Sequence, residues 1–560
     1  MDPIGSSCYN LQIKENARAN LSEEDSQNEK LHEIICSVRS LSKYEGRSFR
    51  TLFPQIAAAS IAASYHIVVG ISLAYSGILI PNLVPHANNV TSDIQIVAST
   101  SETSWIASAI VIVAPIGGIS GGFIMDRFGR LNTLKLATLP GIIGWIIIAM
   151  ATNVPMLIIG RVLTGIGTSW GSSPAIVYIT EIARVDMRGS LISFGPAYAS
   201  LGMVLTFLKG WFLDWRTVAW MCLGYSVIPV ILITLFIPES PAWLVSKGKI
   251  EEAAKSLKWL HRNQPQPEQR TETLAELQLH LLQKEHEIKL EEASRKGTGF
   301  MVKVKKFIKP TGYKPLIILF GLFFFQQFSG IYITLFYSVT FFEKTRSALN
   351  PYLASTLIGT VRFAMSCINT YMLRTFHRRP LIMFSGLGMC FCMFFSGLFT
   401  MWIIEGTSTQ NWVPTTLLLL YVITSMIGLL PIPWTMTAEL FPIEIRGVAH
   451  SIAYSVANLI MFASVQLYYT LEDLFGGIVG IQWFFAVISI LASVYTFIFL
   501  PETHGKKLSE ITDYFTNSSA IYLLSVKRNR SQVPTKKKIP PRNDIVKSNN
   551  KQNEKLIDNA

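Results

Sequence analysis

Charged residues are scarce in this chain. Only 15 % of its 560 residues are Asp, Glu, Lys or Arg, whereas 50 % are hydrophobic. The hydrophobic residues are also gathered in long blocks instead of being spread along the sequence, as they would be in a soluble domain. This composition excludes a water-soluble globular protein of this size and indicates a chain that crosses the membrane many times.

Motifs of catalysis are missing as well. The sequence contains no phosphate-binding loop, no metal-ligand cluster and no nucleophile motif, which excludes an enzyme and an ATP-driven pump. We therefore expect no cofactor and no metal. The six cysteines lie in predicted cytoplasmic or intramembrane positions, so no structural disulfide is expected. The first fifty residues are polar, and no cleavable signal peptide is expected before the first apolar block.

The apolar blocks predict an all-α polytopic membrane protein. About twelve of them reach the roughly 20 residues that a helix needs to cross a hydrocarbon core. The predicted spans are 55–80, 104–125, 133–151, 155–180, 191–209, 217–237, 315–340, 352–373, 380–404, 413–436, 449–470 and 478–500.

The placement of basic residues predicts the orientation. The formal net charge is +13, and Lys and Arg collect before the first span, in the central loop and in the C-terminal tail. The connections after spans 1, 3, 9 and 11 contain neither, so both termini are expected in the cytoplasm of a plasma-membrane protein. We expect these charges to attract anionic lipid and not nucleic acid. The sequon at Asn89 falls in the first outer loop and is a candidate glycosylation site.

The chain is expected to consist of two six-helix bundles and three polar segments. The expected boundaries are a disordered cytoplasmic tail over 1–51, a bundle over 52–244, a helical linker over 245–312, a second bundle over 313–503 and a basic tail over 504–560. Within the linker, 251–261 and 271–293 are rich in Ala, Leu, Glu and Lys, which favours short amphipathic helices.

The two bundles repeat the same landmarks. Glu181 precedes Arg188 by seven positions, and Glu439 precedes Arg446 by the same distance. A Pro-Glu stop signal ends each run of spans, at Pro238 and at Pro501. Internal duplication in a membrane protein is typical of a transporter whose two halves rock about a central site.

The motifs resemble those of the sugar-porter branch of the major facilitator superfamily, and within it the insect trehalose transporter group and the animal glucose transporters. The resemblance covers roughly residues 52–515. The matching segments, in order along the chain, are Gly121–Arg130, Gly160-Arg161, Tyr178–Glu181, Gln326–Ile331, Pro431–Trp434, Ala438–Phe441 and Pro501–Ile511. The resemblance implies a monomeric transport unit that carries a sugar, with trehalose or a hexose as the leading solute.

Acidic and basic residues at the predicted cytoplasmic helix ends form a candidate latch. Arg–carboxylate pairs there would tie the two halves together when the cavity faces outward and would break when it faces inward. The latch candidates are Asp126, Arg127, Arg130, Glu181, Arg188, Glu239, Glu439, Arg446 and Glu502. The alternative is a set of solvated loop charges that obey the topology.

The seventh span carries the first candidates for solute contact. Gln326, Ser329, Gly330, Ile333 and Tyr337 recur at i, i+3, i+4, i+7 and i+11, which predicts one partly polar stripe on an apolar helix. Amide groups both donate and accept hydrogen bonds, which suits a neutral polyhydroxyl solute. Interhelical hydrogen bonding is the alternative role for such residues.

The resemblance extends the candidate site to other spans. It implies that Gln327 lies in the site, that Trp434 lines the cavity after two helix-breaking prolines, and that Phe336 and Tyr337 gate the outer side. An interfacial tryptophan is the alternative for Trp434.

Several positions depart from the family pattern. Tyr332 and Arg362 stand where the family has Asn, and the Asn-Trp pair of the eleventh span is at best Asn458-Leu459. A charge at mid-span costs about 2.5–3.5 kcal/mol, so Arg362 should face a wet cavity or an acid. We hypothesise that Arg362 contacts the solute and selects a partly anionic one. Snorkelling or pairing with carbonyls is the alternative.

The first span has no acidic residue to carry a coupling proton, and its single His66 is more often a packing residue than a proton carrier. We therefore expect facilitated diffusion by alternating access. A carrier of a non-sugar or partly anionic solute and a non-transporting nutrient sensor are the two alternatives.

Overall fold

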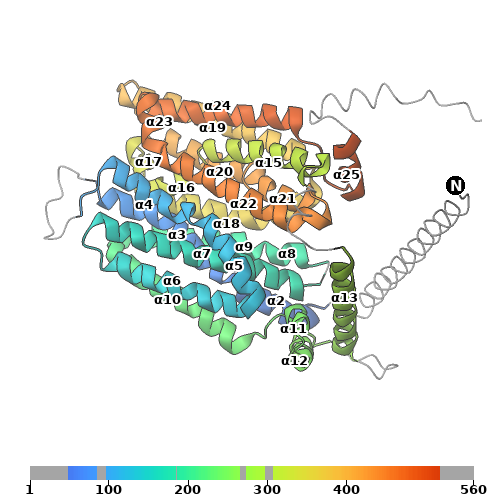
Figure 1. The fold of residues 1–560 in the computed structure, drawn as a ribbon. Coiled ribbons are helices and arrows are strands. Elements are labelled where there is room, and N and C mark those ends of the chain that lie inside the picture. The colour runs from blue at the N-terminus through green and yellow to red at the C-terminus, as the bar shows by residue number, and fades with distance from the viewer. Residues whose placement is uncertain are drawn as a thin grey trace, which may run out of the picture.

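The computed structural model describes residues 48–84, 96–184, 186–264, 273–296, 307–506 and 508–517. Every regular element in these ranges is a helix. The helices form two bundles that lie side by side, with the linker helices across one end (Figure 1). We name this end the linker end and the opposite one the far end.

Nine α-helices and one short 3-10 helix build the first half. They are α2 (Phe49–Ala63), α3 (Tyr65–Leu79), η1 (Ile80–Asn82), α4 (Thr100–Ile112), α5 (Ala114–Phe128), α6 (Arg130–Ala149), α7 (Val154–Ile182), α8 (Arg188–Ile192), α9 (Phe194–Phe212) and α10 (Trp215–Phe236).

The second half begins with a helix that starts at Pro310. Its helices are α15 (Pro310–Phe328), α16 (Ile333–Phe336), α17 (Ser338–Lys344), α18 (Pro351–Thr375), α19 (Arg378–Ile404), α20 (Trp412–Ile427), α21 (Ile432–Glu439), α22 (Ile443–Gln466), α23 (Tyr468–Leu474), α24 (Ile478–Phe499) and α25 (Leu508–Asn517).

Ten helical segments of the described chain are long and apolar enough to cross a membrane. The other two predicted spans, 155–180 and 352–373, coincide with α7 and α18, which are helical over 29 and 25 residues but less hydrophobic. Both are longer than the ~20 residues needed to cross the hydrocarbon core. The protein is therefore a multi-pass membrane protein. The lower hydropathy of α7 and α18 comes in part from the polar residues that they bury, among them Arg161 and Arg362.

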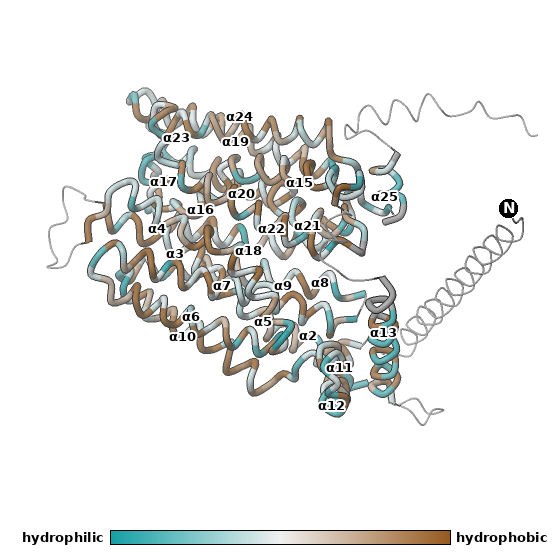
Figure 2. Tube along the Cα trace, viewed as in Figure 1, coloured by the Kyte–Doolittle hydropathy of each residue, from teal (hydrophilic) through white to brown (hydrophobic). Residues whose placement is uncertain are grey.

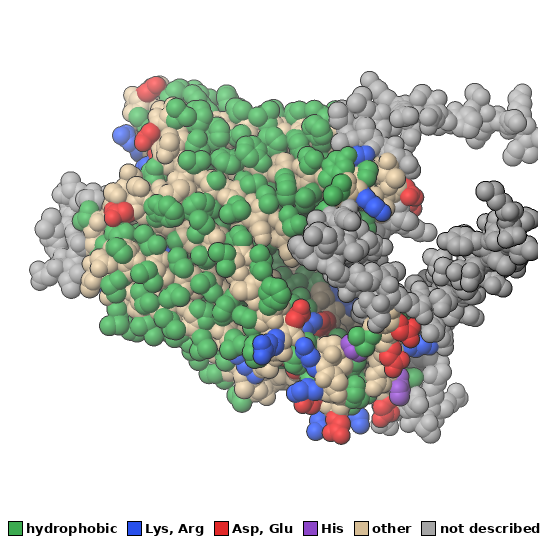
Figure 3. All heavy atoms as spheres, viewed as in Figure 1, with side chains coloured by type: hydrophobic (Ala, Val, Ile, Leu, Met, Phe, Trp, Pro, Cys, Tyr) green, Lys and Arg blue, Asp and Glu red, His purple; other side chains and the backbone are tan. Residues whose placement is uncertain are grey.

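The outer surface of the two bundles is apolar. Figure 3 shows hydrophobic side chains over the flanks of the bundles, with charged side chains confined to the two ends. Large residues such as Ile116, Phe123 and Leu235 are exposed on this surface. Such a belt would be costly in water and is favourable in lipid.

The linker forms helices where the sequence predicts them. Helix α11 (Pro241–Ser246) follows the first half directly, and α12 (Ile250–Leu260) and α13 (Leu274–Lys296) follow. Buried residues Trp243, Leu244, Val245 and Ala253 form a small core of their own between α11 and α12. Figure 2 shows hydrophilic and hydrophobic residues intermixed along α13, and of the two longer linker helices it is α12 that has the more distinct apolar face.

Close helix packing in the first half depends on small residues. A Cβ on Gly70 of α3 would lie 1.8 Å from the Ala199 carbonyl oxygen, and one on Gly202 of α9 would lie 2.2 Å from the Ile67 carbonyl oxygen. Only glycine lets the two backbones approach this closely, which is the usual means of association between helices in lipid.

Two spans of the second half are interrupted in the middle. Helix α15 ends at Phe328 and α16 starts at Ile333, while α20 ends at Ile427 and α21 starts at Ile432. Gly330 has φ +92°, and a Cβ there would lie 2.6 Å from the Phe485 ring. The expectation of one continuous helix over 315–340 is therefore wrong, since Gly330 turns the chain in a conformation that a helix does not allow.

Substitution of Gly330 by Ala should destabilise the protein by about 1–3 kcal/mol, because the new Cβ meets both a positive φ and Phe485. Thermal unfolding of the purified protein in detergent checks this. Gly224→Ala is the control, since a Cβ at this α10 position meets nothing within 4 Å. An equal loss of thermal stability in both variants would contradict this reading of the break.

Candidate functional site

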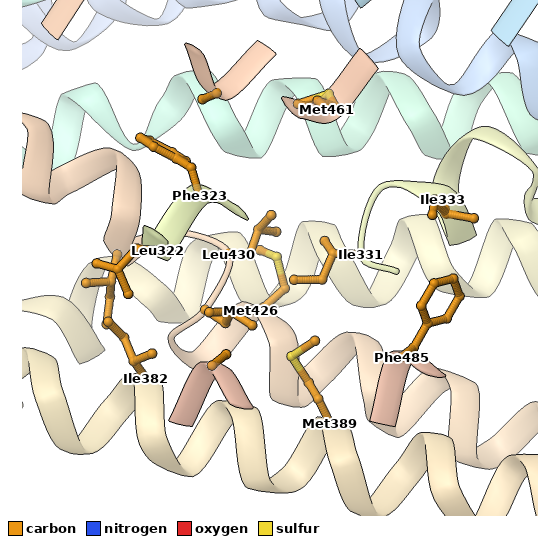
Figure 4. Packing of buried hydrophobic residues seen from close by; sticks show 14 of the residues in the cluster. Leu322, Phe323, Ile331, Ile333, Ile382, Met389, Met426, Leu430, Met461 and Phe485 are labelled. Atoms are coloured by element: carbon orange, nitrogen blue, oxygen red, sulfur yellow. The ribbon is translucent and has the colours of Figure 1, made fainter. Parts of the chain in front are cut away.

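The two helix breaks lie against each other and exchange hydrogen bonds. The Gln326 amide nitrogen donates to the carbonyl oxygens of Leu429 (3.0 Å) and Leu430 (2.8 Å) in the break between α20 and α21. In the other direction, the Tyr421 hydroxyl of α20 donates to the Ser329 carbonyl oxygen (2.8 Å) in the break between α15 and α16. Figure 4 shows Ile331 and Leu430, one from each break, close together.

These bonds satisfy backbone groups that the breaks set free. A carbonyl without a partner inside a membrane costs several kcal/mol, so an unwound segment must find side-chain donors. Ser385 of α19 contributes as well, since its hydroxyl accepts from the Leu429 amide (3.0 Å) and donates to the Thr424 carbonyl (2.7 Å). The sequence analysis missed Tyr421 and Ser385. The only feature that could have identified them is that they are polar residues on otherwise apolar spans.

Gln326 therefore has a structural role in this conformation. It is fully buried and its amide nitrogen is committed to the backbone of the other break. Its carbonyl oxygen accepts from the amide of Gln327 (3.0 Å), whose own carbonyl oxygen is buried without a hydrogen-bond partner in the described part of the chain. The interhelical role given above as the alternative describes Gln326 best.

Aromatic residues surround the breaks. Trp434 of α21 packs against Phe323 at 4.8 Å and against Tyr454 of α22 at 6.0 Å between ring centroids. The Tyr332 hydroxyl lies near the Trp434 side chain. Tyr332, Trp434 and Tyr454 lie in the interior of the bundle pair and still keep accessible surface. Aromatic faces that keep accessible surface suit the apolar faces of sugar rings.

Arg362 lies beside this aromatic group. It is 6 % exposed, occupies the middle of α18, and interacts electrostatically with the phenol groups of Tyr332 and Tyr421. Its Nε is buried, and no described residue accepts a hydrogen bond from it. Tyr332, Arg362 and Trp434 therefore lie near one another, and their contact with a solute stays a prediction.

Asn458 lies one helical turn from Tyr454 on α22. Its amide nitrogen donates to the Tyr454 carbonyl oxygen (2.8 Å), and the residue is 7 % exposed. This bond lies within one helix and uses one N–H of the amide, so the second N–H and the amide oxygen of Asn458 remain available to another partner.

The two gate candidates are buried near the far end. Phe336 and Tyr337 are both fully buried, and the Tyr337 hydroxyl donates to the Val465 carbonyl (3.2 Å). The Tyr337 ring stacks on Tyr468 at 4.5 Å, and its hydroxyl lies near Ser104 of the first half. Tyr337 thus joins the two halves at the far end, although its gating role stays a prediction.

A second set of contacts closes the far end. The Ser108 hydroxyl of α4 donates to Gln466 of α22 (2.7 Å), and Trp105 packs on Phe462 at 5.8 Å. These contacts join the halves between the gate residues and the far surface, so this end of the interface is shut.

An ion pair that the sequence analysis did not identify lies beside the gate. Lys344 of α17 donates to both carboxylate oxygens of Glu472 in α23, each at 2.7 Å. The Lys344 ammonium also lies 5.1 Å from the Tyr469 ring centroid. The pair links two elements of the same half and holds α23 against α17.

The latch candidates form a compact network at the linker end of the first half. Arg130, the first residue of α6, makes a bidentate pair with Glu181 of α7, the shortest contact being 2.7 Å. Glu181 also accepts from the Ser240 hydroxyl. Glu239 accepts from the backbone amides of Arg130 and Leu131 and so caps α6.

The second half repeats this network residue for residue. Arg378, the first residue of α19, pairs with Glu439 of α21 at 3.0 Å, and Glu439 accepts from the Thr503 hydroxyl (2.6 Å). Glu502 accepts from the backbone amides of Arg378 (3.0 Å) and Arg379 (3.1 Å), as Glu239 does in α6. Arg378 was missed by the sequence analysis, although its place at the start of its helix matches that of Arg130.

The protonation of Glu502 follows from this geometry. Partial burial alone would raise the pKa of Glu502, but the backbone amides of His504, Arg378 and Arg379 together hold that pKa below its usual range. Glu502 therefore stays ionised as the cap of α19 at neutral and mildly acidic pH.

Other latch candidates make weaker contacts. Asp126 is 77 % exposed and lies 3.9 Å from Arg130, and Arg127 lies over the Phe128 ring at 5.7 Å. Arg446 donates to the Phe441 carbonyl at 3.4 Å, and Arg188 is exposed. The ion pairs found among the latch candidates in the described residues lie within one half, so in this conformation they do not tie the halves together. That such ion pairs connect the two halves in an outward-facing state stays a prediction.

Contacts between the halves at the linker end are sparse by comparison. The Arg374 guanidinium of α18 donates to the Ser190 hydroxyl of α8 (2.6 Å). Deeper in the bundle, the hydroxyls of Ser200 in α9 and Ser366 in α18 lie 3.2 Å apart. The far end is therefore shut more firmly than the linker end.

Two further predictions concern a glycosylation site at Asn89 and a packing role for His66. Asn89 lies outside the described residues. His66 of α3 is 6 % exposed, and no described residue hydrogen-bonds its Nδ1. Its ring contacts Gly195 of α9, since a Cβ there would lie 3.2 Å from Nε2. This packed position agrees with the packing role expected for His66.

Two duplicated six-span bundles, broken helices at the centre and matching charge networks at one end define a membrane transporter of the major facilitator type, and not an enzyme. The family model described as "Sugar (and other) transporter" matches residues 11–515. The chain belongs to this family.

The relatives with assigned names are insect proteins. The facilitated trehalose transporter Tret1 of Apis mellifera ligustica is 34 % identical over 465 residues, which cover 82 % of this chain and 88 % of the relative. The protein of the same name from Drosophila virilis is 32 % identical over 464 residues, which cover 82 % of this chain but 48 % of the longer relative.

Solved structures share the fold. The inward open conformation of the xylose transporter XylE from E. coli has a TM-score of 0.64 at 24 % identity, covering 81 % of this chain and 98 % of that one. A partially occluded inward open form of XylE has a TM-score of 0.63 at 22 % identity, covering 82 % and 99 %.

Replacing Gln326 by Leu should cost about 1–3 kcal/mol of stability, because two buried carbonyls lose their donor. Gln482→Leu is a matched control. Gln482 is fully buried in α24, and neither of its amide atoms has a described hydrogen-bond partner, so an apolar side chain of similar size should be tolerated. Thermal unfolding in detergent measures both, and equal losses would contradict the role given to Gln326.

Replacing Arg130 or Arg378 by Lys should lower stability by similar amounts, about 1.5–3 kcal/mol, because Lys keeps the charge but loses the fork of guanidinium donors. Arg127→Lys, which removes only a contact with Phe128, is the control. Thermal midpoints measured side by side test the duplication. A loss confined to one of the two halves would refute the equivalence of the networks.

Proposed function

We propose that this protein is a facilitative (uniport) transporter of a sugar, with trehalose or a hexose as the leading solute. The observation that carries the proposal is the pair of hydrogen-bonded helix breaks beside Tyr332 and Trp434 at the interface of two duplicated bundles. Discontinuous helices at mid-membrane are where carriers of this architecture bind solutes. The naming of the insect relatives as trehalose transporters supports the choice of sugar.

The transport cycle follows from the distribution of contacts. In this conformation Tyr337, Ser108–Gln466 and Trp105–Phe462 shut the far end, while contacts at the linker end are few. The solute would leave toward the linker end and enter after the halves rock to open the far end. The intra-half charge networks keep each half rigid during this motion, so the movement is concentrated at the interface.

The same reasoning orients the protein. The basic linker and tails, together with the positive-inside rule, support an orientation with the linker end and both termini in the cytoplasm. The plasma membrane is the location that fits a sugar carrier of this kind. A monomeric transport unit is consistent with apolar flanks that lipid alone can cover. Anionic lipids would contact the basic linker and tail.

Independence from protons is the second part of the proposal. The first span, formed by α2 and α3, has no acidic residue, and His66 is packed against α9. Without a titratable group that changes partners during the cycle, sugar flux should follow the sugar gradient alone.

Uptake of radiolabelled trehalose and glucose into oocytes tests the proposal. We expect saturable uptake with similar rates at pH 5.5 and 7.5, and a loss of at least tenfold in Gln326→Ala at equal surface expression. Gln482→Ala should retain uptake, because its amide has no described partner. Absence of uptake of either sugar by a well-expressed wild-type protein would refute the proposal, and strong stimulation at pH 5.5 would refute its uniport part.

A further inference from the structure

The two buried arginines of the membrane-spanning helices differ in how they are satisfied. Arg161 of α7 is fully buried, and its guanidinium donates to the carbonyl oxygens of Ser72 (2.6 Å) and Ile106 (3.2 Å). It therefore ties three helices of the first half together. Arg362 of α18 is 6 % exposed, but its guanidinium makes no hydrogen bond or ion pair within the described part of the chain.

The charge of Arg362 has no compensating group. Its electrostatic neighbours are the phenols of Tyr332 and Tyr421, which are neutral, and no described acid interacts with it. An isolated buried cation is far more costly than one that is paired and hydrogen-bonded. A side chain in this position is stabilised when a water or an anion completes its hydrogen bonds.

The position of Arg362 relates it to the transport path. Gly359, three residues before it, packs against Val204 of α9, and Ser366, four residues after it, lies 3.2 Å from Ser200 of α9. Positions three and four apart lie on one helix face, so Arg362 lies on the face of α18 that meets the other half. Tyr332 and Tyr421 bring it next to the helix breaks.

We propose that this carrier prefers sugars that bear a carboxylate, such as hexuronates and aldonates, and that Arg362 binds the carboxylate. The inference rests on the proposed function, since it keeps a sugar carrier with the same site, but it moves the preferred solute from a neutral sugar to a sugar acid. A guanidinium pairs with a carboxylate through two parallel N–H···O bonds, and this pair would fill the orphaned donors and cancel the buried charge at once. Tyr332 and Trp434 would receive the remainder of the sugar.

A solute pair that differs only in charge tests this most sharply. Uptake of radiolabelled glucuronate, glucuronamide and glucose is measured in oocytes that express the wild-type protein, Arg362→Asn, Arg362→Lys or Arg262→Asn. Glucuronamide replaces the carboxylate by a neutral amide of the same shape. Arg262 lies on the linker over the Trp259 ring and serves as the control. Surface expression is quantified for every variant.

We expect the wild type and Arg262→Asn to take up glucuronate at least tenfold faster than glucuronamide. Arg362→Asn should reduce this ratio to near one, and Arg362→Lys, which keeps the charge, should retain part of it. The net movement of one negative charge per cycle should also make glucuronate uptake faster when the cell interior is made more positive.

Two other outcomes are decisive. Uptake of glucose and glucuronamide without uptake of glucuronate overturns the inference and leaves the proposed sugar carrier standing. A glucuronate preference that Arg362→Asn does not change also overturns it, since another group would then select the charge. Absence of uptake of all three solutes, together with trehalose, by the well-expressed wild type overturns the proposed function itself.

Discussion

The central part of this protein depends on one reciprocal interaction, the exchange of hydrogen bonds between two interrupted helices. Gln326 supplies the donor that the freed carbonyls of Leu429 and Leu430 require, and Tyr421 supplies one for Ser329. In lipid, neither break could persist without such donors. Because each break is stabilised by a helix of the other, the two cannot move independently. The breaks beside the partly accessible residues Tyr332 and Trp434 are therefore held in shape by the same bonds.

Rigidity elsewhere makes movement at the interface possible. Arg130, Glu181 and Glu239 fix the linker end of the first half, and Arg378, Glu439 and Glu502 do the same in the second. The sequence repeat detected at Glu181 and Glu439 is thus a repeat of a three-dimensional network. Charges arranged in this way stabilise each bundle internally and leave the contacts between bundles weak enough to be exchanged.

Much of the fold could be predicted from the sequence, because span length and basic-residue bias are imposed by the membrane itself. The central site could be predicted only in part. The sequence analysis named Tyr332, Arg362 and Trp434 as candidates for one site. It treated Gln326 as part of a continuous polar stripe, because the helix break depends on the positive φ of Gly330 and on its packing against Phe485. The sequence analysis likewise expected Arg–carboxylate pairs between the two halves, and it did not identify Arg378, which pairs with Glu439 within one half. Such pairings are set by tertiary packing, which local spacing does not encode.

Entrance counterflow in proteoliposomes tests the account most directly. Purified protein is reconstituted into vesicles loaded with unlabelled trehalose or glucose, and the transient accumulation of external labelled sugar is followed with the membrane potential and pH gradient abolished. A carrier that rocks about one central site without a coupling ion predicts accumulation above equilibrium, driven by the internal sugar alone. Failure to accumulate label under these conditions, with accumulation restored by an imposed proton gradient, would contradict the account.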